Sequence, residues 1–308
     1  MPIKTVKKYI CKPLKERAEM EGVTNIESYD NINDINNLNS YIKKLVKQIK
    51  EAHLNPHDKE IRVRKKVNGR NVDFTYNRAS LEDHVINHAT DKYGNKLTYF
   101  SRIPAIRKKS PANRTLQEKE LLNEFNNYIT YVCKAGEDYG VDPKRILAIT
   151  QQEVGCKGLN HLADGKKNNV TGGNGKGYMQ VTSVCIVDVL GGQGNTLDEA
   201  VFNSNIKSKS YNKDFEKLLI SEGFNPNCPL SERKAEAQKI WQKLIRNDDP
   251  EFNIRFGTLW LRYQLEKAND NFKTAAVNYN GSSTKYQYAD SVSKFFNQLV
   301  TNQRKFKH

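Results

Sequence analysis

The sequence predicts a mainly α-helical protein of the α+β class, with a small mixed module at its N-terminus. After residue 118, apolar residues such as Leu121 and Phe125 recur at the three- and four-residue spacing of amphipathic helices. Earlier, residues 61–76 alternate partly around Asn68-Gly69, a dipeptide typical of β-hairpin turns. The length of 308 residues favours two domains or one enlarged domain.

The N-terminal module is expected over residues 1–100 and combines a basic helix with the hairpin. Residues 40–52 place apolar side chains at helical spacing, with lysines elsewhere around the helix. Residues 101–117 contain Pro104, Pro111 and a basic run, which interrupt any periodic pattern and predict a linker. The expected order is therefore a basic accessory module, this linker and a larger domain at 118–308.

The larger domain is expected to consist mainly of helices. A first apolar stripe ends near residues 134–136. A second helix starts at Asp142-Pro143, because Asp is a good N-cap and Pro suits the first turn, and it stops near Gly155. Glu153 therefore falls in its last turn. Residues 158–177 predict a loop or a short irregular β-segment. Later helices are expected at 231–246, 250–265, 273–278 and 288–299.

The chain is strongly basic, with 50 Lys and Arg against 35 Asp and Glu and a net charge of +15. Residues 1–118 carry 24 of the basic residues and 14 of the acidic ones, so most of the excess lies in the N-terminal part. Such a surface favours polyanionic partners, among them nucleic acid, an anionic membrane and cell-wall polymers. A solvated, solubilising surface explains the charge equally well.

Cysteines, histidines and apolar runs argue against several classes of protein. The five cysteines form no Cys-x-x-Cys pair, so neither a zinc cage nor a dense disulfide framework is expected, although one bridge is left open. His53 and His57, like His84 and His88, have ligand spacing, but no third ligand is fixed and no metal or cofactor is expected. No window offers the roughly 18 apolar residues of a membrane span, and the basic N-terminus lacks the apolar run of a secretory signal.

Glu153 has the chemistry of a general acid for glycosidic bond cleavage. The leaving oxygen needs a proton as the oxocarbenium-like transition state develops, and a carboxylic acid supplies it near neutral pH only if its pKa is raised. A helix C-terminus helps, because the negative end of the dipole disfavours a carboxylate. The alternative is a surface charge in a last turn, which is common on its own.

Further motifs follow Glu153 along the larger domain. They are Gly177-Tyr178-Met179-Gln180, Asn253-Ile254 with Gly257, and Tyr279-Asn280-Gly281 with Tyr288. In this order they resemble the soluble lytic transglycosylase and goose-type lysozyme superfamily over about residues 118–299. The run from Gly173 to Val181 is similar to the goose-type version. The resemblance implies a lysozyme-like domain that cleaves the glycan strands of peptidoglycan.

Residue by residue, the resemblance implies a catalytic pair and a set of sugar contacts. Glu153 would act as general acid and then as base, while Tyr279 would hydrogen-bond or orient it. The residues implied to contact the glycan are Gln180, Tyr178 and Met179 through their backbone, Asn253 near the cleft floor, Asn280 and Tyr288.

The sequence departs from the family pattern in three places. Val154 stands where transglycosylases usually have Ser after the catalytic Glu. The interval 181–248 is longer than is common, and would form a lid, a substrate platform or a surface insertion. The goose-type enzymes carry an Asp shortly before the glycine-rich run, where this chain has Thr171.

The number of carboxylates bears on the product. An inverting hydrolase needs a second carboxylate about 6.5 to 9.5 Å from the first. Asp164 is the only acid between Glu153 and Gln180 and hence the candidate second acid, although its Ala-Asp-Gly setting favours a turn. With one carboxylate, Glu153 would protonate the leaving oxygen and then deprotonate the muramoyl C6 hydroxyl, leaving a 1,6-anhydro end. The sequence thus favours a lytic transglycosylase over a hydrolytic muramidase.

Partners and location follow from the same argument. The expected partner is the peptidoglycan glycan strand, cut between N-acetylmuramic acid and N-acetylglucosamine, with virion or wall polymers as partners of the basic module. Nucleic acid is disfavoured. A wall-cleaving domain without a secretory signal predicts a bacteriophage or prophage product, either virion-associated or released with a holin. A non-enzymatic glycan-binding or structural virion protein is the alternative from another class.

Overall fold

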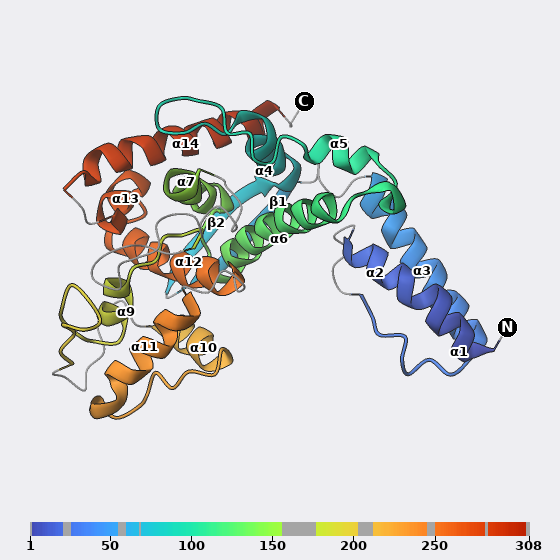
Figure 1. Cartoon of the computed structure of the whole chain (residues 1–308), viewed down its shortest axis with the longest axis horizontal. Coiled ribbons are helices and arrows are strands. Elements are labelled where there is room, and N and C mark those ends of the chain that lie inside the picture. Colours follow the sequence, from blue (N-terminus) through green and yellow to red (C-terminus); the bar gives the residue numbers. More distant parts are fainter. Residues whose placement is uncertain are drawn as a thin grey trace. The chain divides into compact units, whose positions relative to one another are not determined.

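The protein is described here by a computed structural model covering residues 2–20, 26–54, 60–67, 69–155, 177–202, 212–244, 250–280 and 283–305. The chain forms two compact units. The first comprises Met1–Glu60 with Asn77–Ala79, and the second comprises Ile61–Tyr76 with Ser80–His308. The larger unit is mostly helical, which confirms the expected fold class at that level (Figure 1).

The smaller unit is a helical module with its own small core. It contains α1 (Ile3–Val6), a π-helical turn η1 (Lys7–Cys11), α2 (Lys12–Met20) and α3 (Ile35–Leu54). α2 packs against α3. The apolar side chains buried in the core of this unit are Val6, Cys11, Ala18, Leu38, Tyr41 and Leu45.

The hairpin belongs to the larger unit rather than to the helical module. Strands β1 (Glu60–Val67) and β2 (Arg70–Asn77) pair as expected, and Gly69 adopts φ 83° in the turn. They form the one sheet within the described parts of the chain. After β2 come α4 (Arg78–Asp83), a second π-helical turn η2 (His84–His88), α5 (Ile103–Lys108) and the 3-10 turn η3 (Pro111–Asn113).

The segment 101–117 is structured, in contrast to the expected linker. Pro104 lies in the first turn of α5, where its missing N–H leaves no bond unmade. Ile103 and Ile106 are buried in the core of the larger unit. The division between the units therefore falls near residue 60 instead. A proline at a helix start resembles a helix breaker in the sequence, which is why the boundary was misplaced.

Helix α6 (Leu116–Tyr139) forms one wall of the larger unit. It starts with a capping box in which Thr115 and Glu118 exchange hydrogen bonds, and it ends at Gly140 with φ 66°. It runs past the expected end near 134–136. Gly136 lies inside the helix and allows the chain at Val141 to approach closely, because a β-carbon at this position would lie 2.6 Å from the Val141 carbonyl oxygen.

The centre of the larger unit is a bundle of long helices (Figure 1). It consists of α6, α7 (Pro143–Val154), α12 (Pro250–Lys267), α13 (Phe272–Asn280) and α14 (Lys285–Lys305). Helix α7 packs on α6 and α14, while α12 packs on α6 and α13. The end of α7 thus comes close to the helices that carry the tyrosine motifs.

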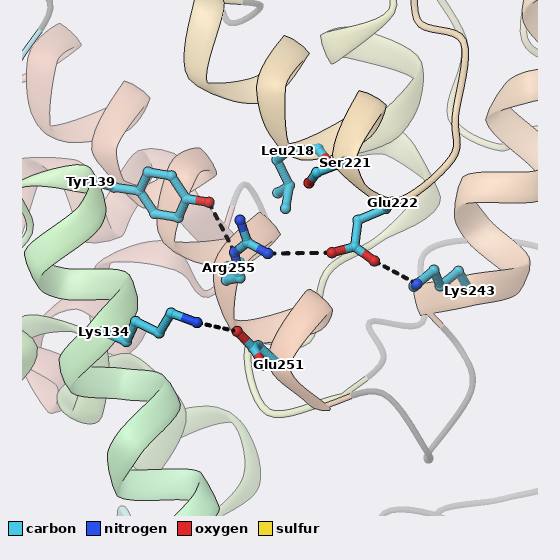
Figure 2. Close-up of polar contacts among 8 residues, drawn as sticks. All are labelled: Lys134, Tyr139, Leu218, Ser221, Glu222, Lys243, Glu251 and Arg255. Carbon is cyan, nitrogen blue, oxygen red and sulfur yellow. Dashed lines mark hydrogen bonds and ion pairs between the residues drawn. The ribbon is translucent and has the colours of Figure 1, made fainter. Parts of the chain in front are cut away.

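The described part of the interval 181–248 forms a helical layer on α12. It contains α9 (Ser183–Val189), α10 (Lys213–Ser221), the 3-10 turn η4 (Leu230–Glu232) and α11 (Arg233–Leu244), with α10 packed on α12 and α11 on α9. Figure 2 shows the polar contacts of this layer. Glu222 joins Arg255 at 3.3 Å and Lys243 at 2.6 Å, and Arg255 donates to the Tyr139 hydroxyl at 3.1 Å.

Within the described ranges, none of the helices combines the length and the apolar character that crossing a bilayer requires.

Candidate active site

Glu153 occupies the last turn of α7, as the sequence predicts. Asp142 caps the helix by accepting a hydrogen bond from the Lys144 backbone N–H, and Pro143 fills the first turn. Gly155 ends the helix with φ 64°, a conformation that disfavours other residues. These local signals alone fix where the carboxylate lies along the helix.

The carboxyl of Glu153 is held in a protonation range suited to acid catalysis. Burial raises its pKa to about 7, since a charged carboxylate is poorly solvated there, and a hydrogen bond from Tyr288 acts in the opposite direction. The Tyr288 hydroxyl donates to Oε1 at 2.7 Å. A carboxyl with a pKa near neutrality is able both to donate and to accept a proton.

Glu153 is bonded by Tyr288 and not by Tyr279. The Tyr279 hydroxyl donates to the Met179 carbonyl oxygen at 2.7 Å. Burial and then the nearby charge of Glu153 raise the pKa of both phenols well above the ordinary value. The sequence expected Tyr279 beside the acid and Tyr288 on the substrate, whereas the structure gives the direct bond to Tyr288.

The turn at 177–180 packs closely against α12. The Met179 N–H donates to Asn253 Oδ1 at 3.0 Å. A β-carbon on Gly257 would lie 2.3 Å from that of Met179, and one on Gly177 would lie 2.2 Å from Asn253 Cγ. Both glycines are therefore required by close packing. Met179 and Asn253 are buried, so their side chains belong to the packed interior between the turn and α12.

Tyr178 is also a core residue. Its ring stacks on Tyr128 at 4.5 Å, and its hydroxyl lies 3.4 Å from a Glu124 carboxylate oxygen. The Tyr128 hydroxyl shares a hydrogen bond with the Thr150 hydroxyl on α7 at 2.5 Å. The turn is thereby tied to the helix of Glu153. A glycan contact at this residue is left to the backbone, as the resemblance implied.

Gln180 and Asn280 are two further residues that the resemblance implies contact the sugar. Both are half-buried. Gln180 has φ 46°, and its side-chain N–H donates to the Gly177 carbonyl oxygen at 2.9 Å, which fixes the amide beside the turn. Asn280 is the last residue of α13.

Asp164, the candidate second acid, lies outside the described residues, as do Thr171 and the glycine-rich run up to Lys176. For the described residues, the pKa of Glu153 responds to burial and to the Tyr288 hydroxyl, and no other carboxylate contributes to its shift. Among the same residues, no cluster of three or more His, Cys, Asp or Glu side chains is arranged to hold a metal ion.

The sequence did not anticipate the role of His84. Its spacing to His88 suggests only a pair of metal ligands. Instead it is fully buried and bonded to Gln151 on α7 and Asn302 on α14, whereas His88 pairs with Asp83 at 3.0 Å. The four-residue spacing between His84 and His88 is the only signal in the sequence, and it indicates metal binding instead of a buried hydrogen-bonded histidine.

No protein-family model matches this chain, and no curated protein or solved structure matches it significantly.

Proposed function

We propose that residues 118–299 form a lysozyme-like domain that cleaves the glycan strand of peptidoglycan, with Glu153 as its acid and base. The observation that carries this proposal is the carboxyl itself. It closes α7, its pKa is raised to about 7 by burial, and Tyr288 bonds one of its oxygens. The motifs that follow Glu153 are joined to one another by hydrogen bonds, because the Met179 N–H donates to Asn253 and the Tyr279 hydroxyl donates to the Met179 carbonyl oxygen.

The proposed reaction uses one carboxylate twice. Glu153 gives its proton to the glycosidic oxygen as the bond to C1 of N-acetylmuramic acid breaks. The resulting carboxylate then takes the proton of the C6 hydroxyl of the same sugar, and O6 bonds to C1. The products are a free hydroxyl on N-acetylglucosamine and a 1,6-anhydro end, and Glu153 is protonated again without any water consumed.

The described surroundings of Glu153 fit a reaction that uses one carboxylate. A hydrolytic muramidase that inverts would need a second carboxylate to activate water, and the described residues contribute none to the electrostatics of Glu153. Tyr288 bonds and orients the carboxyl, while Gln180 and Asn280 offer neutral amide groups to sugar hydroxyl and N-acetyl groups.

The deciding experiment is mass spectrometry of purified peptidoglycan digested with the full chain. Muramoyl products with 1,6-anhydro ends are expected from the wild type and not from Glu153→Gln. Reducing muramoyl ends without anhydro products would establish the hydrolytic alternative. An inactive but folded wild type that still sediments with glycan would support a non-enzymatic glycan-binding protein.

For the smaller unit we propose attachment to anionic cell-wall polymers. Lys4, Lys8 and Lys12 are exposed, recur every four residues along α1, η1 and α2, and form no ion pair within the described residues. Tyr9 beside them is 65% exposed. A stripe of exposed cations matches a phosphate-bearing polymer better than a neutral glycan.

Sedimentation of the full chain with purified cell walls tests this attachment. Replacing the three lysines by Glu is expected to weaken binding to walls that carry anionic polymers. A control variant matched in charge replaces three exposed lysines of the larger unit, Lys119, Lys267 and Lys294. Equal binding by both variants, or stronger retention of the wild type on DNA than on walls, would exclude the proposed partner.

A further inference from the structure

A buried histidine joins three elements behind the candidate active site. His84 lies in η2 and is fully buried. Its Nε2 lies 2.8 Å from Gln151 Oε1 on α7, and its Nδ1 lies 3.2 Å from Asn302 Nδ2 on α14. Gln151 and Asn302 are themselves buried. The two helices bridged in this way are the ones that carry Glu153 and Tyr288.

The hydrogen-bond partners define the protonation state of the ring. The Gln151 amide N–H donates to the Thr90 carbonyl oxygen at 2.7 Å, so the amide oxygen faces His84. Nε2 must therefore carry a hydrogen and donate it. Asn302 presents its NH₂ group to Nδ1, which must accept and hence be unprotonated. Neutral imidazole with hydrogen on Nε2 satisfies every group, whereas imidazolium would set one N–H against another.

The geometry of α7 explains why this bridge matters for Glu153. Gln151 and Glu153 are two residues apart, so their side chains leave the helix about 200° apart. Gln151 is linked to Asn302 on α14 through the His84 ring, whereas Glu153 bonds Tyr288 on α14 directly. Asn302 and Tyr288 are 14 residues apart, which is about 21 Å along that helix. The end of α7 is thus attached to α14 at two separate places. One attachment runs through Gln151 and His84, and the other is the bond between Glu153 and Tyr288.

We propose that His84 is a positioning residue whose neutral ring holds the end of α7 so that Glu153 meets Tyr288, and whose protonation at acidic pH releases this hold. The inference rests on the proposed function, and it adds a regulation of that site by pH. His84 touches no reacting atom and acts through Gln151 and Asn302.

The surroundings of His84 lower the pKa of its ring from the ordinary value for histidine. Burial lowers the pKa of the ring, the bond to Gln151 raises it, His88 lowers it and Asp83 raises it. His88 and Asp83 belong to the neighbouring turns, while α7 and α14 meet the ring with uncharged amides. A surface cleft of about 670 Å³ along α14, lined by His88 and Asn302 among others, brings solvent to this side of the bridge.

The pH profile of glycan cleavage tests the proposal. Activity of the wild type is expected to fall above pH 7, because Glu153 ionises there. It is also expected to fall on the acidic side, by about tenfold for each pH unit, because His84 gains a proton. His84→Gln is expected to abolish the acidic loss. His88→Gln is the matched control and is expected to retain it. An unchanged acidic limb in His84→Gln would overturn the proposal.

A second variant works in the opposite direction. Asn302→Asp supplies an acceptor to Nδ1, so the charged ring is bonded on both sides. Cleavage is then expected to persist at acidic pH with the ring protonated. This separates release by protonation from any general loss of packing, because the histidine is still present. An acidic limb as steep as that of the wild type in this variant would count against the mechanism.

NMR keeps the test independent of catalysis. With ¹⁵N-labelled histidine in the full chain, His84 is expected to show the neutral Nε2–H form at pH 7, and the Asn302→Asp variant the charged form. The ¹³C chemical shift of the Glu153 carboxyl is expected to change once as Glu153 itself titrates, and a second time at the pH at which His84 titrates. A wild type without lytic activity would defeat the proposed function alone. Loss of that second shift, or a charged ring at pH 7, would defeat the positioning role.

Discussion

Tyr288 on α14 donates its hydroxyl to Glu153 on α7 at 2.7 Å, while Tyr279 on α13 donates to the Met179 backbone at the same distance. Two tyrosines nine residues apart thus have different tasks. One acts on the carboxyl directly, and the other supports the turn beneath it.

Glu153→Gln is expected to abolish cleavage and to stabilise the protein above neutral pH. The folded pKa of this acid is raised to about 7 from an ordinary 4.5. Its contribution to stability is therefore complete below pH 4.5 and is lost as the pH rises through 7, by about 3 kcal/mol. Gln stays neutral and accepts the Tyr288 hydrogen bond. Activity should fall at least about a hundredfold.

Urea unfolding of both proteins at pH 5 and pH 8 measures the stability effect. The variant should be the more stable one at pH 8, and the difference should shrink at pH 5. A variant that is equally destabilised at both pH values would show that Glu153 is not the buried acid described above.

Tyr288→Phe is expected to move the alkaline limit of activity to higher pH. The lost hydrogen bond opposes the effect of burial on Glu153, so its removal raises the pKa of the carboxyl further. The maximal rate should fall between about ten- and a hundredfold, because the acid is no longer held in place. The pH dependence of initial rates on soluble glycan strands measures both effects.

Tyr279→Phe is the matched control for that experiment. It removes one phenolic hydroxyl and leaves the Tyr288 bond to Glu153 intact. We expect a stability loss of about 1 kcal/mol and no upward move of the alkaline limit. If the limit moved with Tyr279→Phe and stayed with Tyr288→Phe, the orienting role would return to Tyr279.

Gly257→Ala is expected to destabilise the protein despite the better helix propensity of Ala. The propensity gain is about 1 kcal/mol, whereas the new β-carbon would lie 2.3 Å from that of Met179. Overpacking of this kind costs about 1 to 3 kcal/mol, and the shift of the 177–180 turn should also lower activity. The free energy of unfolding in urea measures the loss.

A double-mutant cycle identifies the cause of that loss. The clash needs both β-carbons, so Gly257→Ala should cost much less in a Met179→Gly background. Additive losses would mean that Gly257 is required for another reason.

The sequence predicts the parts of this site that depend on neighbouring residues, such as the ends of a helix. It does not predict the parts that depend on contacts between distant segments. Glu153 was placed correctly because Asp142, Pro143 and Gly155 define α7 by themselves. Which tyrosine reaches the acid depends on how α13 and α14 rotate against α7, and spacing along the chain carries no such information. His84 was missed for the same reason, since its partners lie 67 and 218 residues away.

The contacts of Glu222 predict that the layer of α10 and α11 is a fixed part of the larger unit. Its carboxylate bonds Arg255 on α12 and Lys243 on α11, and all three side chains are largely buried (Figure 2). Charged hydrogen bonds of this kind contribute about 1.5 to 3 kcal/mol each. Glu222→Gln is therefore expected to cost at least about 1.5 kcal/mol and to increase amide exchange in α10 and α11.

Glu251→Gln is the control for this last prediction, because Glu251 pairs with Lys134 at 3.1 Å nearer the surface. Exposed pairs contribute about 0 to 1 kcal/mol, so the loss should be small. Hydrogen exchange followed by mass spectrometry distinguishes a scaffold from a lid. A scaffold loosens only in Glu222→Gln, whereas a lid would exchange quickly in the wild type and slow down when glycan binds.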